Sequence, residues 1–224
     1  MPHPKGGYKN KDKKRVPGVT TIGGRFKDAG GLLYWACDQG KAIERGEISN
    51  LYDKRDEAGE AGTFAHDLVF KDIRKDPDDP LPQYKGETEI EKWAWQGFRN
   101  YSNWAEDSKI KIIDQEMELV SEEYQYGGCP DAIGMDSRGQ LCLLDWKTSK
   151  GIYVDYLVQL AAYKHLWEEN HPEQPLVGGL HLLHFSKEYA DFHHHYWSEL
   201  DDAWEQFKLF RKAYDLDKKL KRRI

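Results

Sequence analysis

The sequence predicts an α/β domain in which a central mixed β-sheet is flanked by helices. Three observations lead to this fold class. Helical patterns fill the N-terminal part of the chain, strand-like segments follow in the middle, and a further helix, two strands and a closing helix complete the sequence. Because helices come before, within and after the strands, a mixed α/β arrangement is the one expected.

The N-terminal residues are polar, basic and rich in glycine and proline, and they predict a flexible arm over residues 1–15. Residues 16–224 are expected to form a single domain, since a chain of 224 residues suits one compact unit. Basic residues from Lys5 to Arg15, and those of the segment 218–224, could contact phosphates or could serve solubility alone.

Helical patterns are expected over residues 23–46, 56–75 and 88–107, with a surface loop rich in proline and aspartate over 76–87. In the last of these helices the large apolar side chains fall near one stripe, which consists of Ile90, Trp93, Phe98, Tyr101 and Trp104. A stripe at this spacing favours burial in the core over an exposed stacking platform.

Residues 111–120, 122–136 and 139–149 have the pattern of successive strands in an antiparallel meander. A well-formed helix is expected over 154–170, two more strands over 176–186 and 191–199, and a closing helix over 201–221.

Composition excludes several classes of function. The formal net charge of −6 disfavours a protein that coats nucleic acid by bulk electrostatics. The 3 cysteines form no Cys-x-x-Cys pair, so no iron–sulfur cluster is expected, and no glycine-rich loop ends in Gly-Lys-Ser/Thr, so no ATP site is expected. Without a long apolar run or the apolar core of a signal peptide, no membrane contact is expected, and the protein is expected to be cytoplasmic.

The residues that predict chemistry are Asp131, Asp145 and Lys147. Asp145 and Lys147 follow an apolar strand and are two apart, so both side chains emerge on one face of the strand. An isolated Asp-x-Lys is usually a surface salt bridge. Asp131, however, lies in an apolar context on the preceding strand, and the short turn between the strands lets the two carboxylates converge. Paired hard oxygen ligands suit Mg²⁺ or Mn²⁺, and Lys147 beside them could position an attacking water molecule.

The ordered set of Asp131, Asp145-Trp146-Lys147 and then Gln159 and Tyr163 on the next helix resembles the RecB-type branch of the PD-(D/E)XK nuclease superfamily, close to stand-alone phage-type exonucleases. Gln159 and Tyr163 are four apart, so a helix places them on one face. The resemblance extends to an upstream helical histidine, which the segment GEAGTFAHDLV supplies as His66, with the small residues Gly62 and Thr63 letting that helix approach the sheet.

The resemblance implies a restriction-endonuclease-like core and a deoxyribonuclease that requires Mg²⁺, for which Mn²⁺ would substitute. The implied catalytic residues are Asp131, Asp145, Lys147, Gln159 and Tyr163, and the implied metal contacts are His66, Asp131, Asp145 and the Trp146 carbonyl. It further implies an exonuclease acting on linear DNA ends in recombination, repair or genome processing, of phage or prokaryotic origin, and a recombination or single-strand annealing protein as a partner. The helix over 88–107 could form the wall of a channel that selects ends.

Three alternatives remain open from the sequence. The chain could be a structure-specific DNA endonuclease, a non-catalytic DNA-binding recombination module in which the same charges form a structural network, or a hydrolase of small phosphoesters.

Two further clusters carry weaker signals. His193, His194 and His195, with His181 and His184, predict a half-exposed strand rather than a zinc site, because consecutive strand residues point to opposite faces. Asp114, Glu116 and Glu118 alternate along one strand face and should be solvated, although Glu116 or Glu118 could flank the metal centre.

Overall fold

The computed structural model describes residues 4, 6–27, 30–51, 53–149, 151–186, 189 and 191–224. Its helices are α1 (Val19–Gly23), α2 (Gly30–Glu44), α3 (Asp53–Arg74), α4 (Glu89–Asp107), α5 (Val154–Asn170) and α6 (Asp201–Lys221). Its strands are β1 (Lys111–Gln115), β2 (Leu119–Ser121), β3 (Tyr126–Gly128), β4 (Ala132–Met135), β5 (Leu141–Lys147), β6 (Leu180–Phe185) and β7 (Phe192–Trp197).

A mixed five-stranded sheet with the order β1-β4-β5-β6-β7 forms the centre of the molecule. The pairs β1–β4, β4–β5 and β6–β7 are antiparallel, whereas β5 and β6 are parallel. Helix α5 provides the crossover that a parallel pair requires. The predicted fold class, a mixed sheet flanked by helices, is therefore confirmed.

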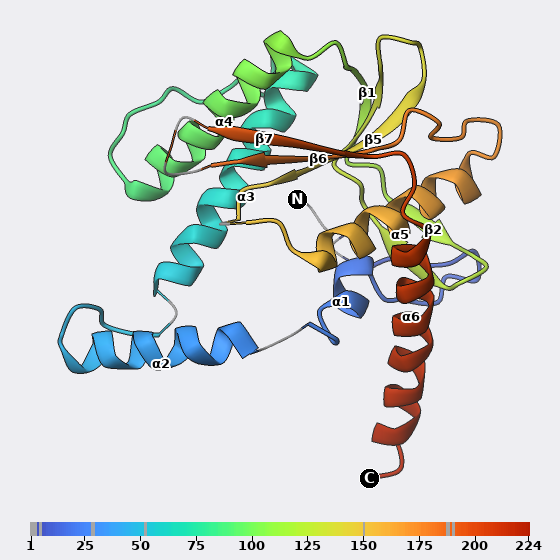
Figure 1. The fold of residues 1–224 in the computed structure, drawn as a ribbon, viewed down its shortest axis with the longest axis horizontal. Coiled ribbons are helices and arrows are strands. Elements are labelled where there is room, and N and C mark those ends of the chain that lie inside the picture. The colour runs from blue at the N-terminus through green and yellow to red at the C-terminus, as the bar shows by residue number, and fades with distance from the viewer. Residues whose placement is uncertain are drawn as a thin grey trace.

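Each face of the sheet carries its own apolar core. One core joins α3 and α4 to the sheet through side chains such as Leu68, Phe98 and Leu144. The other joins α1, α5 and α6 to the opposite face through side chains such as Ile22, Leu160 and Phe207. Figure 1 shows these helices on the two sides of the sheet, with α2 standing apart from both. Within the described part of the chain, no helix is both long and apolar enough to cross a membrane.

Helix α4 begins at Thr88, whose side chain accepts a hydrogen bond from the Glu91 backbone N–H and so caps the first turn. The aromatic stripe of this helix faces the sheet, because Phe98, Tyr101 and Trp104 are buried against it. The prediction that the stripe belongs to the core is thus confirmed for these three residues. The suggestion that the helix walls a DNA channel stays a prediction, and these three buried rings are not available to a DNA strand.

Two of the predicted strands are each divided in the structure. Glu116 adopts a positive φ of 52°, which breaks the segment 111–120 after β1 and sends its second part into a separate two-stranded sheet, β2–β3. The segment 122–136 is divided between β3 and β4, with Cys129 and Pro130 between them. Because the strand ends at Gln115, the expected alternation of Asp114, Glu116 and Glu118 along one strand face is wrong.

The first helical segment also differs from the prediction. Residues 19–23 form the short α1, residues 24–27 are not helical, and α2 begins at Gly30. The part of the predicted helix at residues 28 and 29 lies outside the described residues. Gly23 and Gly24 explain the interruption, because adjacent glycines disfavour continuation of a helix.

Residues 8–15 of the predicted N-terminal arm fold back and contact the rest of the molecule. Lys9 and Arg15 form an isolated antiparallel bridge, the Tyr8 side chain is buried, and Asn10 donates a hydrogen bond to the Gln125 side chain at 2.7 Å. A Cβ on Gly127 would come within 2.4 Å of the Tyr8 side chain, so the ring is seated directly on the backbone of β3. Residues 1–3 and 5 of the predicted arm lie outside the described residues.

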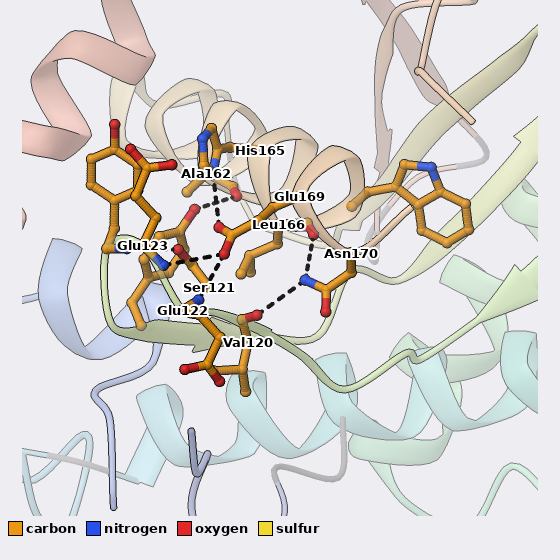
Figure 2. A network of polar contacts seen from close by, with 12 residues as sticks. Val120, Ser121, Glu122, Glu123, Ala162, His165, Leu166, Glu169 and Asn170 are labelled. Carbon is orange, nitrogen blue, oxygen red and sulfur yellow. Dashed lines mark hydrogen bonds and ion pairs between the residues drawn. The ribbon is translucent and has the colours of Figure 1, made fainter. Parts of the chain in front are cut away.

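A polar network joins α5 to the β2–β3 hairpin (Figure 2). One oxygen of the Glu169 carboxylate accepts hydrogen bonds from the backbone N–H groups of Glu122 and Glu123, at 2.7 and 3.2 Å. Asn170 donates to the Val120 carbonyl at 3.0 Å. These bonds satisfy backbone groups at the hairpin and fix its position against the helix that also carries the candidate site residues.

Candidate active site

Antiparallel pairing of β4 with β5 brings Asp131 and Asp145 together. Ala132 pairs with Leu144, so the register places Asp131, directly before β4, opposite Asp145. Ile133 and Leu143 lie on the sheet face that carries α5, and alternation along the strands puts both carboxylates on that same face. The convergence expected from the sequence is therefore present in the fold.

Both carboxylates are buried and only partly satisfied. The exposed fractions of the two residues are 2% for Asp131 and 0% for Asp145. Asp131 Oδ2 accepts a hydrogen bond from the Trp146 backbone N–H at 2.7 Å. Among the described residues, Asp131 Oδ1 and Asp145 Oδ1 have no hydrogen-bond partner. Buried oxygen atoms of this kind are costly unless another group binds them.

Lys147 supplies the positive charge at these carboxylates. Its ammonium group forms an ion pair with Asp145 Oδ2 and lies 5.1 Å from the centre of the Tyr156 ring. Burial opposes the charged form of Lys147, but the charges of Asp145 and Asp131 outweigh burial and raise its pKa. Lys147 therefore stays protonated at neutral pH and can hold a negatively charged or polar ligand.

Burial shapes the ionisation of the acids. It raises the pKa of Asp145 to about 6, with the Lys147 charge lowering it and the Asp131 charge raising it. Burial also raises the pKa of Asp131, against the Lys147 charge and the Trp146 hydrogen bond. Two carboxylates share a single lysine here, so an additional cation would stabilise the doubly ionised pair.

His66 reaches the same place from α3. Its Nδ1 lies 3.8 Å from Asp131 Oδ1, and its ring is hydrogen-bonded to the Trp146 backbone. Burial, followed by the Lys147 charge, lowers the pKa of His66 to about 3, so the imidazole is neutral at physiological pH and has a lone pair to offer. Gly62, one turn earlier, permits the approach of the helix, because a Cβ there would stand 2.8 Å from Thr148 Oγ1.

Gln159 and Tyr163 lie on α5, as the sequence predicts, and contact each other. Gln159 Nε2 donates a hydrogen bond to the Tyr163 hydroxyl at 2.8 Å. Burial and the Asp145 charge raise the pKa of Tyr163 well above its ordinary value, so it remains a neutral phenol beside the carboxylates. Val158, Leu160 and Ala161 pack into the core on the other sides of the helix, as expected.

The structure therefore brings together His66, Asp131, Asp145, Trp146 and Lys147. Tyr163 lies near enough for the Asp145 charge to raise its pKa, and Gln159 is linked to Tyr163 by a hydrogen bond. The structure adds Tyr156. This residue contacts Lys147 and lines a cavity of about 560 Å³ together with His66, Trp146, Thr148 and Ser149. A signal was present in the sequence, because Tyr156 precedes Gln159 by three residues and Tyr163 by seven, on the same helical face. Glu116 also lies near the acids. Burial raises the pKa of the Glu116 carboxyl, and the charge of Asp131 raises it further.

The donor set suits a hard divalent cation in chemistry, although the described residues hold no ready-made group of three or more His, Cys, Asp or Glu ligands. Two buried carboxylate oxygens without partners, a neutral imidazole and a backbone carbonyl are groups that Mg²⁺ or Mn²⁺ accepts. Lys147 is paired with Asp145, so a cation at the two acids would compete with that ion pair.

Comparison with known proteins adds little. Neither a family model nor a curated protein matches the sequence. Among solved structures, a protein from Eubacterium rectale described as a candidate exonuclease is 13% identical, with 88% of this chain and 72% of that chain covered and a TM-score of 0.38. The protein SSO0001 is also 13% identical, with 67% and 72% covered and a TM-score of 0.32. Likeness of this degree carries no argument about function.

Proposed function

We propose that this protein is a metal-dependent nuclease that hydrolyses phosphodiester bonds of DNA, with exonuclease action on linear ends as its principal activity. The observation that supports the proposal most strongly is the pair of buried carboxylate oxygens without partners, on Asp131 and Asp145, beside the protonated Lys147. The acids are buried directly behind Lys147 and His66, which line an open cavity, and an acid pair beside such a lysine is suited to attack of water on a phosphate diester.

In this proposal Asp131, Asp145, His66 and the Trp146 carbonyl would hold one or two Mg²⁺ ions, with Mn²⁺ able to substitute. A divalent cation there supplies Lewis acidity, lowering the pKa of a bound water molecule and offsetting negative charge on the phosphate. Lys147 orients the water or a phosphate oxygen through its N–H groups. Gln159 and Tyr163, which are linked by a hydrogen bond, would orient the DNA or the lysine.

The first test is digestion of end-labelled linear DNA, single- and double-stranded, and of closed circles, with Mg²⁺, with Mn²⁺ and with chelator. Wild-type protein should degrade linear DNA only when a divalent ion is present and should leave circles intact. Nicked circles would instead assign an endonuclease. Binding of DNA without breakage in any condition would favour the non-catalytic module, and hydrolysis of model diesters without regard to polymer length would favour a small-phosphoester hydrolase.

The variant Lys147→Ala gives the decisive comparison. Cleavage should fall on the order of a hundredfold or more while the protein still folds and binds DNA, because the side chain acts on the reacting groups. A matched control is Lys208→Ala, which removes a lysine paired with Glu205 on α6. Near-normal cleavage by Lys147→Ala would exclude the proposed role of this lysine.

A further inference from the structure

The pairing of three strands places polar side chains in a row that starts at Lys147. Lys147 on β5 pairs with His184 on β6, and His184 pairs with His193 on β7. Two residues further along, Leu182 is aligned with Asp145 on one side and with His195 on the other. Paired residues lie on the same face of a sheet, so these histidines share the face of the candidate active site.

The surroundings of the strands confirm which face this is. Leu182 and Trp197 belong to the core on the α5 side, and both share the alternation of His184, His193 and His195 along their strands. His194 points the other way, where Trp104 of α4 donates a hydrogen bond to its Nδ1 at 3.3 Å. The expectation that the consecutive histidines divide between two faces of a half-exposed strand is thereby confirmed.

The rings of the row are stacked or tilted against one another, with His193 and His195 at 44°, and exposure rises from the buried His184, 9% exposed, to His193. His184 and His193 are stacked with an interplanar angle of 12°, and His195 is stacked with Trp197 at 14°. The His193 side chain is 60% exposed, and the row ends at β7, which is an edge strand of the five-stranded sheet. The His184 ring is anchored by a hydrogen bond to the Ser149 carbonyl, beside the cavity that Lys147 lines.

We propose that His193 and His195, which continue from the buried His184 beside Lys147, form a track for a single DNA strand that leads to the edge of the sheet, an inference that rests on the proposed nuclease function. Imidazole N–H groups can donate to phosphates, and flat rings can stack on unpaired bases. Neighbouring strands are roughly 4.8 Å apart, so Lys147 and His193, two strands apart, are separated by about 10 Å. A strand whose phosphate reacts at Lys147 would therefore reach His193 within a short distance.

The charges favour a single strand over a duplex. The track carries few permanent positive charges, and the Asp191 carboxylate lies 3.3 Å from His193 Nε2, so bulk attraction for phosphates is small. Stacking, by contrast, needs bases that are not paired and does not depend on ionic strength to the same degree. The track therefore binds through rings and hydrogen bonds rather than through net charge, which agrees with an overall charge of −6.

The test is fluorescence anisotropy of labelled oligothymidine of roughly 20 nucleotides with the full chain, in chelator so that no strand is cut. The double variant His193→Ala, His195→Ala should raise Kd by about tenfold or more, given the cost of losing base stacking. The matched control is Tyr196→Ala, which removes an exposed ring from the opposite face of the same strand and should change Kd less than about twofold. Circular dichroism of each variant shows whether the fold is kept.

Several outcomes would overturn the track. These are an unchanged Kd in the double variant, an equal loss in Tyr196→Ala, and a loss for duplex DNA as large as that for the single strand. With Mg²⁺ present, the double variant should raise KM for the single strand and leave kcat unchanged. A protein that cleaves DNA but is indifferent to the two histidines would keep the nuclease function and exclude the track. Binding that depends on the two histidines, without any cleavage, would keep the track and exclude the nuclease function.

Discussion

At the residue scale, the site is defined by atoms that the fold leaves without partners. Asp131 Oδ1 and Asp145 Oδ1 are buried, and no described residue donates a hydrogen bond to them. Burial raises the pKa of both acids, and the Lys147 charge counteracts this rise only in part. A fold gains nothing in stability from such an arrangement, and the proposed divalent cation would explain it.

Replacement of Asp145 by asparagine tests this explanation. Mn²⁺ that binds only the folded protein should raise the Tm of the wild type. The ion should stabilise the fold by about 2.7 kcal/mol when its concentration is 100 times its Kd. Asp145→Asn should lose most of this increase, because the amide offers a neutral oxygen in place of a charged one. Differential scanning fluorimetry with and without Mn²⁺ measures the effect. Asp217→Asn, which alters an acid paired with Arg25 far along α6, should keep the full increase.

At the scale of elements, the close approach of α3 to the end of β5 holds His66 over the carboxylates. Gly62 makes this approach possible, since a Cβ at this position would stand 2.8 Å from Thr148 Oγ1. Gly59 lies one turn earlier in the same helix, and a Cβ there would meet nothing within 4 Å. Substitution of either glycine by alanine raises helix propensity, but only the substitution at Gly62 creates a steric contact. Comparing the two variants therefore isolates the cost of that contact.

The variant Gly62→Ala should lose about 1–2 kcal/mol of stability, because a side chain is forced against Thr148. Gly59→Ala should instead gain up to about 1 kcal/mol, because alanine is the better helix former. Urea unfolding of both variants measures the two free energies. A gain in both would show that the end of β5 yields easily to α3, contrary to the packing described.

A second prediction at this scale concerns a chain of hydrogen bonds between α4 and strands β6 and β7. Trp104 Nε1 donates to His194 Nδ1, so His194 Nε2 carries the proton and donates to His181 Nδ1 at 2.7 Å. His181 Nε2 in turn lies 3.3 Å from the Gly178 carbonyl. Each ring nitrogen in this chain thus acts either as a donor or as an acceptor. A proton added to Nδ1 of His181 would make it face the N–H group of His194 Nε2, and the two N–H groups would repel each other.

Burial, then the nearby His194, lowers the pKa of His181 to about 4, below the value of an unfolded histidine near 6.5. In this pH range the unfolded chain binds the proton more readily, so stability should fall as pH drops from about 6.5 to 4, by on the order of 2 kcal/mol from this group. Urea unfolding at several pH values should show a shallower fall for His181→Gln. An unchanged slope would exclude His181 as the source.

At the scale of the whole molecule, segments distant in sequence close the structure. The N-terminal segment lies on β3, and Phe26 stacks on Phe210 of α6 with ring centres 4.9 Å apart. Arg25 pairs with Asp217 on the same helix. Residues before the sheet are thereby tied to the hairpin and to the C-terminal helix, which together cover the face that carries the site.

Substitution of Tyr8 by alanine tests how much the contact of the N-terminal segment with β3 contributes to stability. Tyr8→Ala should cost about 3 kcal/mol, because the ring is buried against Gly127 and a cavity would remain. Lys11→Ala, in the same segment but exposed, should change stability by less than about 0.5 kcal/mol. Equal effects of the two substitutions would mean that the segment behaves as the flexible arm that its composition suggests.

The resemblance to a nuclease family suggested His66, Gln159 and Tyr163 as site residues. The sequence pattern by itself determined the mixed α/β class, most helix and strand positions, and the convergence of Asp131, Asp145 and Lys147. These features follow from local periodicity and from side-chain alternation, which neighbouring residues control. Other features were decided only by the tertiary structure: the folding back of residues 8–15, the break at Glu116 and the row from Lys147 to His193. Each depends on which surface a segment meets, and that surface is built by residues far away in the chain.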